Sequence, residues 1–224
     1  CRKWYRNYEA ETKNVTAPVV VSLKETKNNM KMESSGDFNE LIDRNIGLVT
    51  AKKYGVKSVI SGGQVVQHSY PYYVANEIAG YKVRDKDKMF SWSGNSKGTG
   101  LFGEQLFQNK GKYITVTEGE CDAMAAYELL GSQDFKNSLE FLENFDTVVI
   151  NFDNDKPGRE AARKVAKLLT PGKAKILYMP DEYKDANDML KQFKQGLYVT
   201  AWWAAKTYTP SGVMNLSDNL DKLK

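Results

Sequence analysis

Acidic residues follow two apolar, β-branched runs of the sequence, in a pattern suited to holding a divalent cation. Glu118 follows the run 112–117, and Asp153 and Asp155 follow the run 147–152. If both runs are parallel strands of one sheet, their carboxyl ends meet at one edge and bring the three carboxylates together. Carboxylates that lie close repel one another unless a cation separates them, and Mg²⁺ prefers such oxygen ligands. The pattern therefore predicts a site for metal-assisted phosphoryl transfer.

Each acidic motif is ambiguous when it is considered alone. The tripeptide Glu118-Gly119-Glu120 is common in loops, and Asp153-Asn154-Asp155 is more often a turn or a helix cap. The order strand, Glu-Gly-Glu, helix, then strand, Asp-x-Asp-x-x-Gly-Arg, helix is far rarer than either part. The joint order therefore favours a functional interpretation over a structural one.

The elements that must position these acids alternate between strand and helix. In this half of the chain we expect strands over 112–117, 147–152 and 174–179, and helices over 122–130, 135–144, 157–169 and 197–207, with a further helix opening at 184–188. Such alternation is typical of an α/β fold with a parallel sheet flanked by helices. The sequence therefore predicts that the acids lie at the carboxyl edge of this sheet.

The preceding residues have a different pattern, which predicts a smaller α+β unit. We expect helices over 37–48 and 50–54, and strands over 56–60, 64–70, 72–74 and 80–83. Residues 1–36 are polar and read mainly as a linker, with one possible strand at 19–21.

A basic stretch ends the strand-rich part of this smaller unit. Its cations Lys82, Arg84, Lys86 and Lys88 are spaced two residues apart, so they would share one face of a strand. Stretches of this kind are more often solvated hairpins, but a one-sided basic ribbon is also a suitable surface for nucleic acid.

Several other features indicate structural roles or exclude classes of protein. His68 and Trp202-Trp203 are expected to pack in the fold, and Cys121 is expected to be a small core residue. The glycine-rich segment 94–100 lacks the Gly-Lys-Ser/Thr order of a P-loop, which argues against an ATPase motor here. The formal charge of +4 permits a nucleic-acid partner without requiring one. No apolar run approaches the roughly 18 residues of a membrane span.

Five motifs, taken in order, resemble one known family. They are the segments 82–88, 101–103, 116–120, 152–155 with Gly158-Arg159, and 184–187, and together they extend over roughly 37–207. The order is similar to a TOPRIM domain, the metal-binding module of primases and of type IA and type II topoisomerases. More closely, it resembles the primase (RNA polymerase) domain of the bifunctional primase-helicase of short-tailed phages.

The resemblance implies DNA-templated synthesis of short RNA primers from NTPs by two-metal phosphoryl transfer. Glu118, Asp153 and Asp155 would hold Mg²⁺ or Mn²⁺, and Asp185 would be a further catalytic acid. Lys82, Arg84 and Lys88 would bind nucleotide or template. The implied partners are single-stranded DNA, NTPs and a C-terminal ring helicase in the same polypeptide, which could form a hexamer. No membrane is implied, and the place of action would be the cytoplasm of the infected bacterial host.

The same resemblance suggests a division of the chain. Residues 1–36 would be a linker with the remnant of an N-terminal zinc ribbon, because Cys1-Arg2-Lys3-Trp4 resembles the end of such a ribbon. One thiolate cannot hold Zn²⁺, so no zinc is expected in this chain. Residues 37–108 would be a small mixed α/β basic subdomain and 109–207 the TOPRIM subdomain. Residues 208–224 would be a linker toward the helicase, with an amphipathic helix at 216–223.

Two alternatives stay open from the sequence. One is a TOPRIM nuclease or topoisomerase-like enzyme, and the other is a non-catalytic DNA-binding module of a replicative helicase. The presence of all four acids favours activity. The interval of 35 residues from Glu118 to Asp153 is shorter than in the resembling family, which predicts either a smaller sheet or a missing strand.

Overall fold

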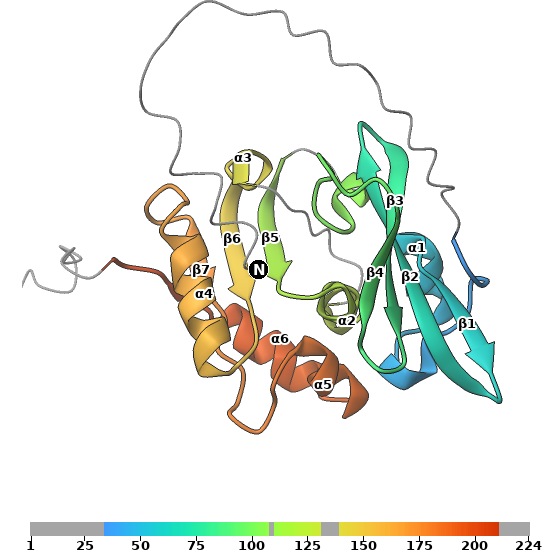
Figure 1. Cartoon of the computed structure of the whole chain (residues 1–224). Helices are drawn as coiled ribbons and strands as arrows, with labels where there is room; N and C mark the ends of the chain where they lie inside the picture. The colour runs from blue at the N-terminus through green and yellow to red at the C-terminus, as the bar shows by residue number, and fades with distance from the viewer. Residues whose placement is uncertain (1–33, 108–109, 131–138, 211–224) are drawn as a thin grey trace, which may run out of the picture.

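The structure is a computed structural model of the chain, and it describes residues 34–107, 110–130 and 139–210. The expected strand at 19–21, the residue Cys1 and the helix expected at 216–223 lie outside the described residues, as does the first part of the helix expected over 135–144. The described backbone forms two four-stranded sheets with helices around and between them (Figure 1).

The first sheet is an antiparallel meander. Its strands are paired in the order of the chain, namely β1 (Lys57–Ser61), β2 (Gln64–Val74), β3 (Glu77–Asp85) and β4 (Phe90–Gly94). The helix α1 (Leu48–Tyr54) precedes it and ends at Gly55, whose positive φ of 70° closes the helix as expected. The short 3-10 helices η1 (Ile42–Arg44) and η2 (Glu104–Leu106) flank the sheet. The two strands expected over 64–70 and 72–74 are a single strand.

The prediction of a helix over 37–48 is wrong. Leu41 and Ile46 form an isolated β-bridge around η1, and Asn45 between them has a left-handed φ of 54°. The loop buries Leu41 and Ile46 completely, whereas Phe38 and Ile42 stay exposed. The apolar residues therefore do not share one helical face, although their spacing in the sequence is helical.

The second sheet is mostly parallel and carries the candidate acids. Its strands are β5 (Gly111–Thr117), β6 (Phe145–Asn151), β7 (Ala174–Ile176) and β8 (Lys206–Thr207), paired in that order, with only β8 antiparallel. The helices are α2 (Glu120–Leu130), α3 (Leu139–Leu142), α4 (Lys156–Ala166), α5 (Ala186–Lys191) and α6 (Gln195–Trp203). The expected α/β class, with a parallel sheet flanked by helices, is confirmed.

The C-terminal end of the parallel-sheet unit differs from the prediction. The helix expected to reach residue 207 stops at Trp203, and Lys206 and Thr207 pair with β7 instead. Trp202 is buried and donates its indole N–H to Thr115 Oγ1 at 3.0 Å, as expected of a packing residue, but Trp203 is 62% exposed. Both tryptophans therefore contact Tyr113 of β5, but only Trp202 is buried between the helix and the sheet.

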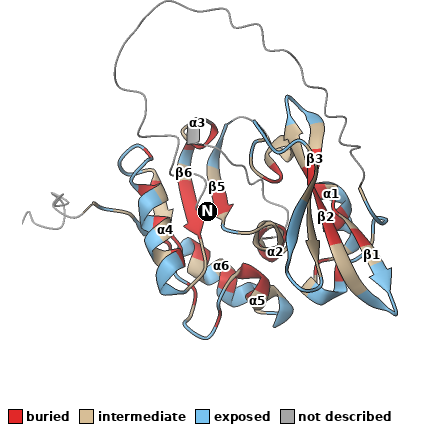
Figure 2. Ribbon diagram, in the orientation of Figure 1, coloured by how far each residue is buried: buried red, intermediate tan, exposed pale blue. Residues whose placement is uncertain are grey.

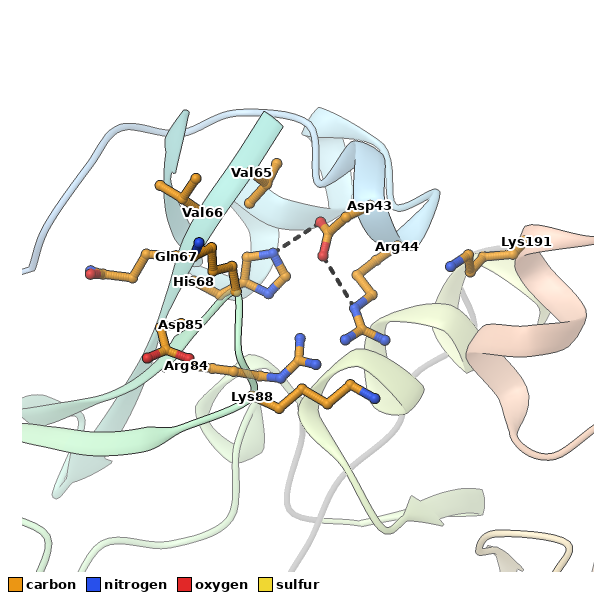
Figure 3. A pocket seen from close by; sticks show the side chains of 11 residues that line it. Asp43, Arg44, Val65, Val66, Gln67, His68, Arg84, Asp85, Lys88 and Lys191 are labelled. Atoms are coloured by element: carbon orange, nitrogen blue, oxygen red, sulfur yellow. Dashed lines mark hydrogen bonds and ion pairs between the residues drawn. The ribbon is translucent and has the colours of Figure 1, made fainter. Parts of the chain in front are cut away.

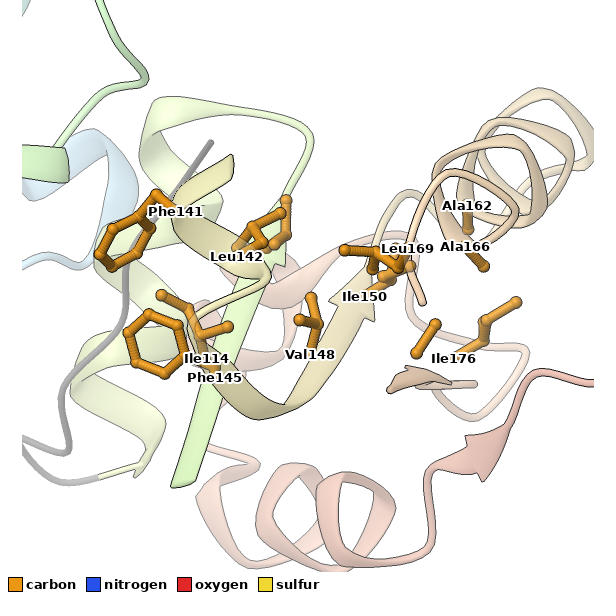
Figure 4. Packing of buried hydrophobic residues seen from close by; sticks show 12 residues of the cluster. Ile114, Phe141, Leu142, Phe145, Val148, Ile150, Ala162, Ala166, Leu169 and Ile176 are labelled. Carbon is orange, nitrogen blue, oxygen red and sulfur yellow. The ribbon is translucent and has the colours of Figure 1, made fainter. Parts of the chain in front are cut away.

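Three clusters of buried side chains fix the arrangement of the sheets (Figure 2). One lies between the sheet and α3 and α4, where Ile114, Val148 and Ile150 meet Ala162 (Figure 4). A second packs α2, α5 and α6 on the opposite side of the sheet. The third joins the two units, because aromatic side chains of the first unit contact Met124 of α2. The helix that follows Glu118 is therefore anchored to both sheets.

Within the described residues, no helix is both long enough and apolar enough to cross a membrane.

Candidate active site

The predicted acids lie at the carboxyl edge of the parallel sheet. Glu118 follows β5 and Asp153 follows β6, and these strands pair in register up to Thr117 and Asn151. Asp155 caps α4 and Asp185 caps α5. Because parallel strands that end at the same level deliver their next residues to one edge, Glu118 and Asp153 are placed side by side by backbone geometry alone.

The charges of these acids influence one another. Burial raises the pKa of Glu118, and the nearby charges of Asp153 and Asp155 raise it further. A like charge disfavours ionisation only when it is close, so the three predicted metal ligands share one space. An unbalanced group of carboxylates of this kind is electrostatically costly, and a cation at this edge would relieve the repulsion.

One protein cation already lies at this edge. The Nζ atom of Lys184 is 2.7 Å from Oδ2 of Asp153, and this bond is the main cause of the raised pKa of Lys184. The side chain of Lys184 is 62% exposed, so it can swing into solvent at little cost. Lys184 therefore balances part of the negative charge without blocking the edge permanently.

The two capping acids are each partly engaged by their own helix. Asp155 Oδ1 accepts a hydrogen bond from the backbone N–H of Gly158 at 2.8 Å, and Asp185 Oδ1 accepts one from Asp188 at 2.7 Å. These are N-cap bonds, which fix the side-chain orientation. In the described part of the chain, Oδ2 of each acid has no hydrogen-bond donor, so one oxygen remains for a ligand.

The loop between Asp153 and Asp155 is held by Asn154. The side-chain amide of Asn154 donates to the carbonyl oxygens of Met179, Pro180 and Tyr183 at 3.1–3.2 Å. Its Oδ1 accepts from Arg159 at 3.0 Å. Nearly all the hydrogen-bonding capacity of the amide is thus used to position the two neighbouring acids.

Gly158 gives a direct test of this tight loop. A Cβ atom at position 158 would lie 2.2 Å from the carbonyl oxygen of Asp153. We expect Gly158→Ala to lower the free energy of unfolding by about 3 kcal/mol, because backbone must move. Urea unfolding checks this. Gly196→Ala is the control, since its Cβ would meet nothing within 4 Å and should be neutral or stabilising by up to ~1 kcal/mol. Equal effects of the two substitutions would contradict the close approach.

Asp122 is a further acid that sequence reasoning treated only as the start of a helix. Burial raises its pKa, and the charges of Asp185 and Asp153 raise it further. Its Oδ1 accepts a hydrogen bond from the backbone N–H of Asn187 at 3.2 Å. Its spacing in the sequence could have indicated this position. Asp122 lies four residues after Glu118 and hence in the first turn of a helix that begins at this edge.

The edge suits a divalent cation by the chemistry of its donors. It gathers carboxylates, which are hard oxygen ligands, and they repel one another as they stand. Among the residues that the structure describes, no three acidic, histidine or cysteine side chains are already arranged as a cage around a metal. Binding would therefore require small side-chain rotations and release of Lys184 from Asp153.

Lys82 is placed differently from the other two predicted basic residues. Its Nζ is 2.6 Å from Glu120 Oε1 and 4.6 Å from the centre of the Phe90 ring. Tyr72 donates its hydroxyl to the same Glu120 oxygen at 2.7 Å. Glu120 is only 10% exposed, so Lys82 neutralises a nearly buried carboxylate that joins β2, β3 and α2.

This ion pair predicts a stability effect. We expect Lys82→Met to lower the free energy of unfolding by ~1–3 kcal/mol, because it leaves the Glu120 charge poorly solvated. The double variant Lys82→Met with Glu120→Gln should recover at least half of that loss. Urea unfolding of the set checks it, with Lys97→Met in an exposed loop as a control that should change by less than about 0.5 kcal/mol. Additive losses would show that the two side chains do not interact.

Arg84 and Lys88 meet at a pocket of about 340 Å³ (Figure 3). The basic ribbon was expected to continue as a strand through Lys88, but β3 ends at Asp85. Residues 86–89 turn back toward β4, and Lys88 has a positive φ of 65°. Arg84 and Lys88 therefore reach the same pocket from a strand and from a turn rather than from one strand face.

Comparison with known proteins shows which family the chain resembles. The family model described as Toprim-like matches residues 115–190. The DNA helicase/primase of Enterobacteria phage T3 is 30% identical over 207 residues, which are 86% of this chain and 36% of that protein. The chain is therefore similar to a phage helicase/primase, and its region 115–190 is Toprim-like. The resemblance carried by the sequence motifs is thereby confirmed.

Solved structures of these primase domains have the same fold. The primase fragment of the bacteriophage T7 primase-helicase is 29% identical, with a TM-score of 0.63 over 76% of each chain. A chain from a complex of the T7 lagging-strand DNA polymerase with primase domains bound to an RNA/DNA hybrid and dTTP has a TM-score of 0.68 and 29% identity, over 77% of this chain and 94% of that one. The Aquifex aeolicus primase, 16% identical with a TM-score of 0.58, shares the fold over 81% of this chain and 59% of its own.

Proposed function

We propose that this primase domain makes short RNA primers on a single-stranded DNA template. The proposal rests on the carboxyl edge of β5 and β6. There the carboxylates of Glu118, Asp153 and Asp155 lie close enough to influence one another. Nucleotidyl transfer moves a highly charged triphosphate. A primase therefore needs acidic ligands that hold divalent cations against this charge. The naming of the T3 relative as a helicase/primase supports the same activity.

The reaction assigns separate tasks to the residues of the chain. Glu118, Asp153 and Asp155 would hold Mg²⁺ or Mn²⁺, which when bound supplies positive charge to the phosphates and to the attacking hydroxyl. Lys184 leaves Asp153, and Asn154 keeps the acidic loop in place. Arg84 and Lys88 bind phosphate groups. A primer 3′-hydroxyl oxygen bonds to the α-phosphorus, the bond from that phosphorus to the bridging oxygen breaks, and pyrophosphate leaves while the hydroxyl proton passes to solvent.

Further partners belong to the same proposal. The chain spans 36% of the length of the T3 relative, whose name joins helicase and primase. We propose that NTPs and single-stranded DNA are the substrates, and that a ring helicase in the same polypeptide assembles the domain into a hexamer. We also propose that residues 1–36 connect to a zinc ribbon and residues 208–224 to the helicase, with Asp185 as a further catalytic acid. Replication of phage DNA would place the protein in the cytoplasm of the infected host.

Primer synthesis can be assayed directly. The chain is incubated with single-stranded DNA of mixed sequence, the four NTPs and MgCl₂, and the products are resolved on a denaturing gel. Alkali-sensitive dinucleotides and short oligonucleotides are expected. DNA cleavage without ribonucleotide products would indicate a nuclease, and DNA binding without either product would indicate a non-catalytic module.

A further inference from the structure

Four side chains from three elements form a hydrogen-bond relay that the proposed reaction does not use. Oδ1 of Asp43 in η1 lies 3.0 Å from Nε2 of His68, and Nδ1 of His68 lies 2.7 Å from the hydroxyl oxygen of Tyr70. The same hydroxyl oxygen lies 3.3 Å from Sγ of Cys121 in α2. The relay therefore runs from the partly exposed Asp43 to the first turn of the helix that follows Glu118.

The donors and acceptors of the relay fit a single direction. Burial opposes ionisation of Asp43, but the bond to His68 and nearby positive charges lower its pKa, so the carboxylate only accepts. In a neutral His68 ring, Nε2 is then the donor, and Nδ1 accepts from the Tyr70 hydroxyl. Burial raises the pKa of Tyr70, and it raises the pKa of Cys121 to about 11, so both side chains keep their protons. The oxygen of Tyr70 accepts from the thiol of Cys121, and every member of the relay has a partner.

Packing holds the relay in this geometry. His68 is 2% exposed and Tyr70 is 1% exposed, and their rings meet edge to face with centroids 5.7 Å apart. Tyr70 also meets Phe102 edge to face at 5.6 Å, inside the buried cluster that joins the two units. Water does not readily replace a lost partner in such a site, so removal of one member leaves a buried polar group unsatisfied. The neighbouring members must then move.

The relay ends in the turn that carries acidic side chains. Cys121 lies between Glu120 and Asp122 in the first turn of α2, three residues after Glu118. The charges of Asp185 and Asp153 raise the pKa of Asp122 in addition to the effect of burial, so this turn faces the acidic edge. A shift of the turn would therefore change the separation of the carboxylates that a cation must bridge.

Three successive residues of this turn are each fixed by a different side chain or backbone group. Glu120 accepts from Tyr72, Cys121 contacts Tyr70, and Asp122 accepts from the backbone N–H of Asn187. His68, Tyr70 and Tyr72 alternate along β2, so they share the face of the strand that meets α2. Of the three contacts, the one at Cys121 involves no carboxylate, so it can be removed without changing the charge of the edge.

We propose that His68, Tyr70 and Cys121 are positioning residues for the acidic edge. Their hydrogen bonds fix the first turn of α2, and this turn places Asp122 and the preceding Glu118 for a divalent cation. The three side chains touch neither the cation nor the substrate, and they act through the backbone of the turn. The inference rests on the proposed function for the cation site, and it gives a functional role to residues whose sequence pattern indicated packing alone.

Direct metal binding tests the proposal without depending on activity. Mn²⁺ is titrated into the full chain without nucleotides, and free Mn²⁺ is measured by electron paramagnetic resonance. The variants Tyr70→Phe and Cys121→Ala each remove one member of the relay, whereas Cys121→Ser keeps a hydrogen-bond donor. Tyr54→Phe is the matched control, because Tyr54 is equally buried in the same cluster and its hydroxyl makes no hydrogen bond among the described residues. Thermal unfolding confirms that each variant is folded.

We expect Tyr70→Phe and Cys121→Ala to bind Mn²⁺ about 10-fold more weakly than the original chain, and Cys121→Ser and Tyr54→Phe to stay within about twofold of it. If Tyr70→Phe and Cys121→Ala bind as tightly as Tyr54→Phe, even with reduced stability, the relay is only structural and the proposal is overturned. Binding that is unchanged in Asp153→Asn would place the cation elsewhere and would also overturn it. If the expected losses occur but the original chain makes no primers, the proposed function fails and the positioning role stands.

The relay itself can be observed without a metal. In a Cys1→Ser background, Cys121 is the only remaining cysteine and gives the only S–H stretching band in the infrared spectrum. A thiol that donates a hydrogen bond absorbs at a lower frequency than a free thiol, so Tyr70→Phe should shift this band upward and Tyr54→Phe should not. A band that stays in place in Tyr70→Phe would show that the thiol does not donate to Tyr70, and the relay would be wrong.

Discussion

Replacing Asp153 by asparagine should reduce primer synthesis at least about 100-fold while leaving the fold intact. The substitution keeps the size of the side chain and removes one negative charge from the edge where Glu118 and Asp155 also lie. Asp153 would act through the cation that it holds, and loss of one preorganised electrostatic group at a reacting centre typically costs about 10²–10³ in rate. The side chain of Asp153 is 19% exposed and its ion-pair partner Lys184 is 62% exposed, so the change in folding free energy should stay below about 1 kcal/mol. The rate of oligoribonucleotide formation checks the prediction.

Asp146→Asn is the matched control for this experiment. Asp146 lies near the opposite, amino end of the same strand β6 and is exposed. Its substitution makes the same chemical change at the amino edge of the sheet, away from the other acids. Primer synthesis should therefore stay within about twofold of the original rate. If the two variants lose activity equally, or if Asp153→Asn retains it, the carboxyl edge is not the catalytic site.

Replacing Asp122 by asparagine should stabilise the metal-free protein at pH 8 by ~1–3 kcal/mol. Burial raises the pKa of Asp122, with further raising by the charges of Asp185 and Asp153. A carboxyl group whose pKa is raised in the folded state contributes its full stability below its ordinary pKa, and this is lost as pH rises through the folded-state value. The neutral amide keeps the oxygen that accepts from Asn187 and carries no charge to be penalised. Urea unfolding in EDTA, from pH 4 to pH 8, measures the difference.

The sign of this effect depends on pH and on metal. The difference between Asp122→Asn and the original chain should be small near pH 4 and should grow toward pH 8. MgCl₂ should reduce it, because a cation stabilises the charged form of the original chain more than the neutral variant. Asp146→Asn should show no such trend. A difference that is constant over this pH range would contradict the placement of Asp122 among the other acids.

The acidic edge was predictable from the sequence because local signals determine it. Two β-branched runs, each followed at once by acids, predict parallel strands whose ends meet, and the structure places Glu118 and Asp153 in that way. Asp155 follows the strand β6, and Asp185 precedes the helix α5. Both acids are N-caps and also lie at the edge. Most strands and helices were likewise predictable from periodicity, but β4 (Phe90–Gly94) and β8 (Lys206–Thr207) were not predicted as strands.

Features that depend on distant contacts were not predictable. Leu41 and Ile46 have helical spacing, but a β-bridge between them and their burial against α2 and β2 override the local preference. Lys82 belongs to the basic ribbon by spacing, yet it forms an ion pair with the nearly buried Glu120. The pocket that Arg84 and Lys88 reach is also lined by Arg44 and Lys191, which are 147 positions apart and meet only when α5 packs beside η1. No periodic pattern encodes such a meeting.

A single reaction tests the central claim most directly. Single-stranded DNA labelled at its 5′ end with fluorescein is incubated with the chain, MgCl₂ and NTPs that include one α-³²P-labelled nucleotide, and both labels are followed on one gel. We predict radioactive, alkali-sensitive oligoribonucleotides that require MgCl₂ and template, vanish with Asp153→Asn, and leave the fluorescent DNA intact. Fluorescent DNA fragments without radioactive products would contradict the account.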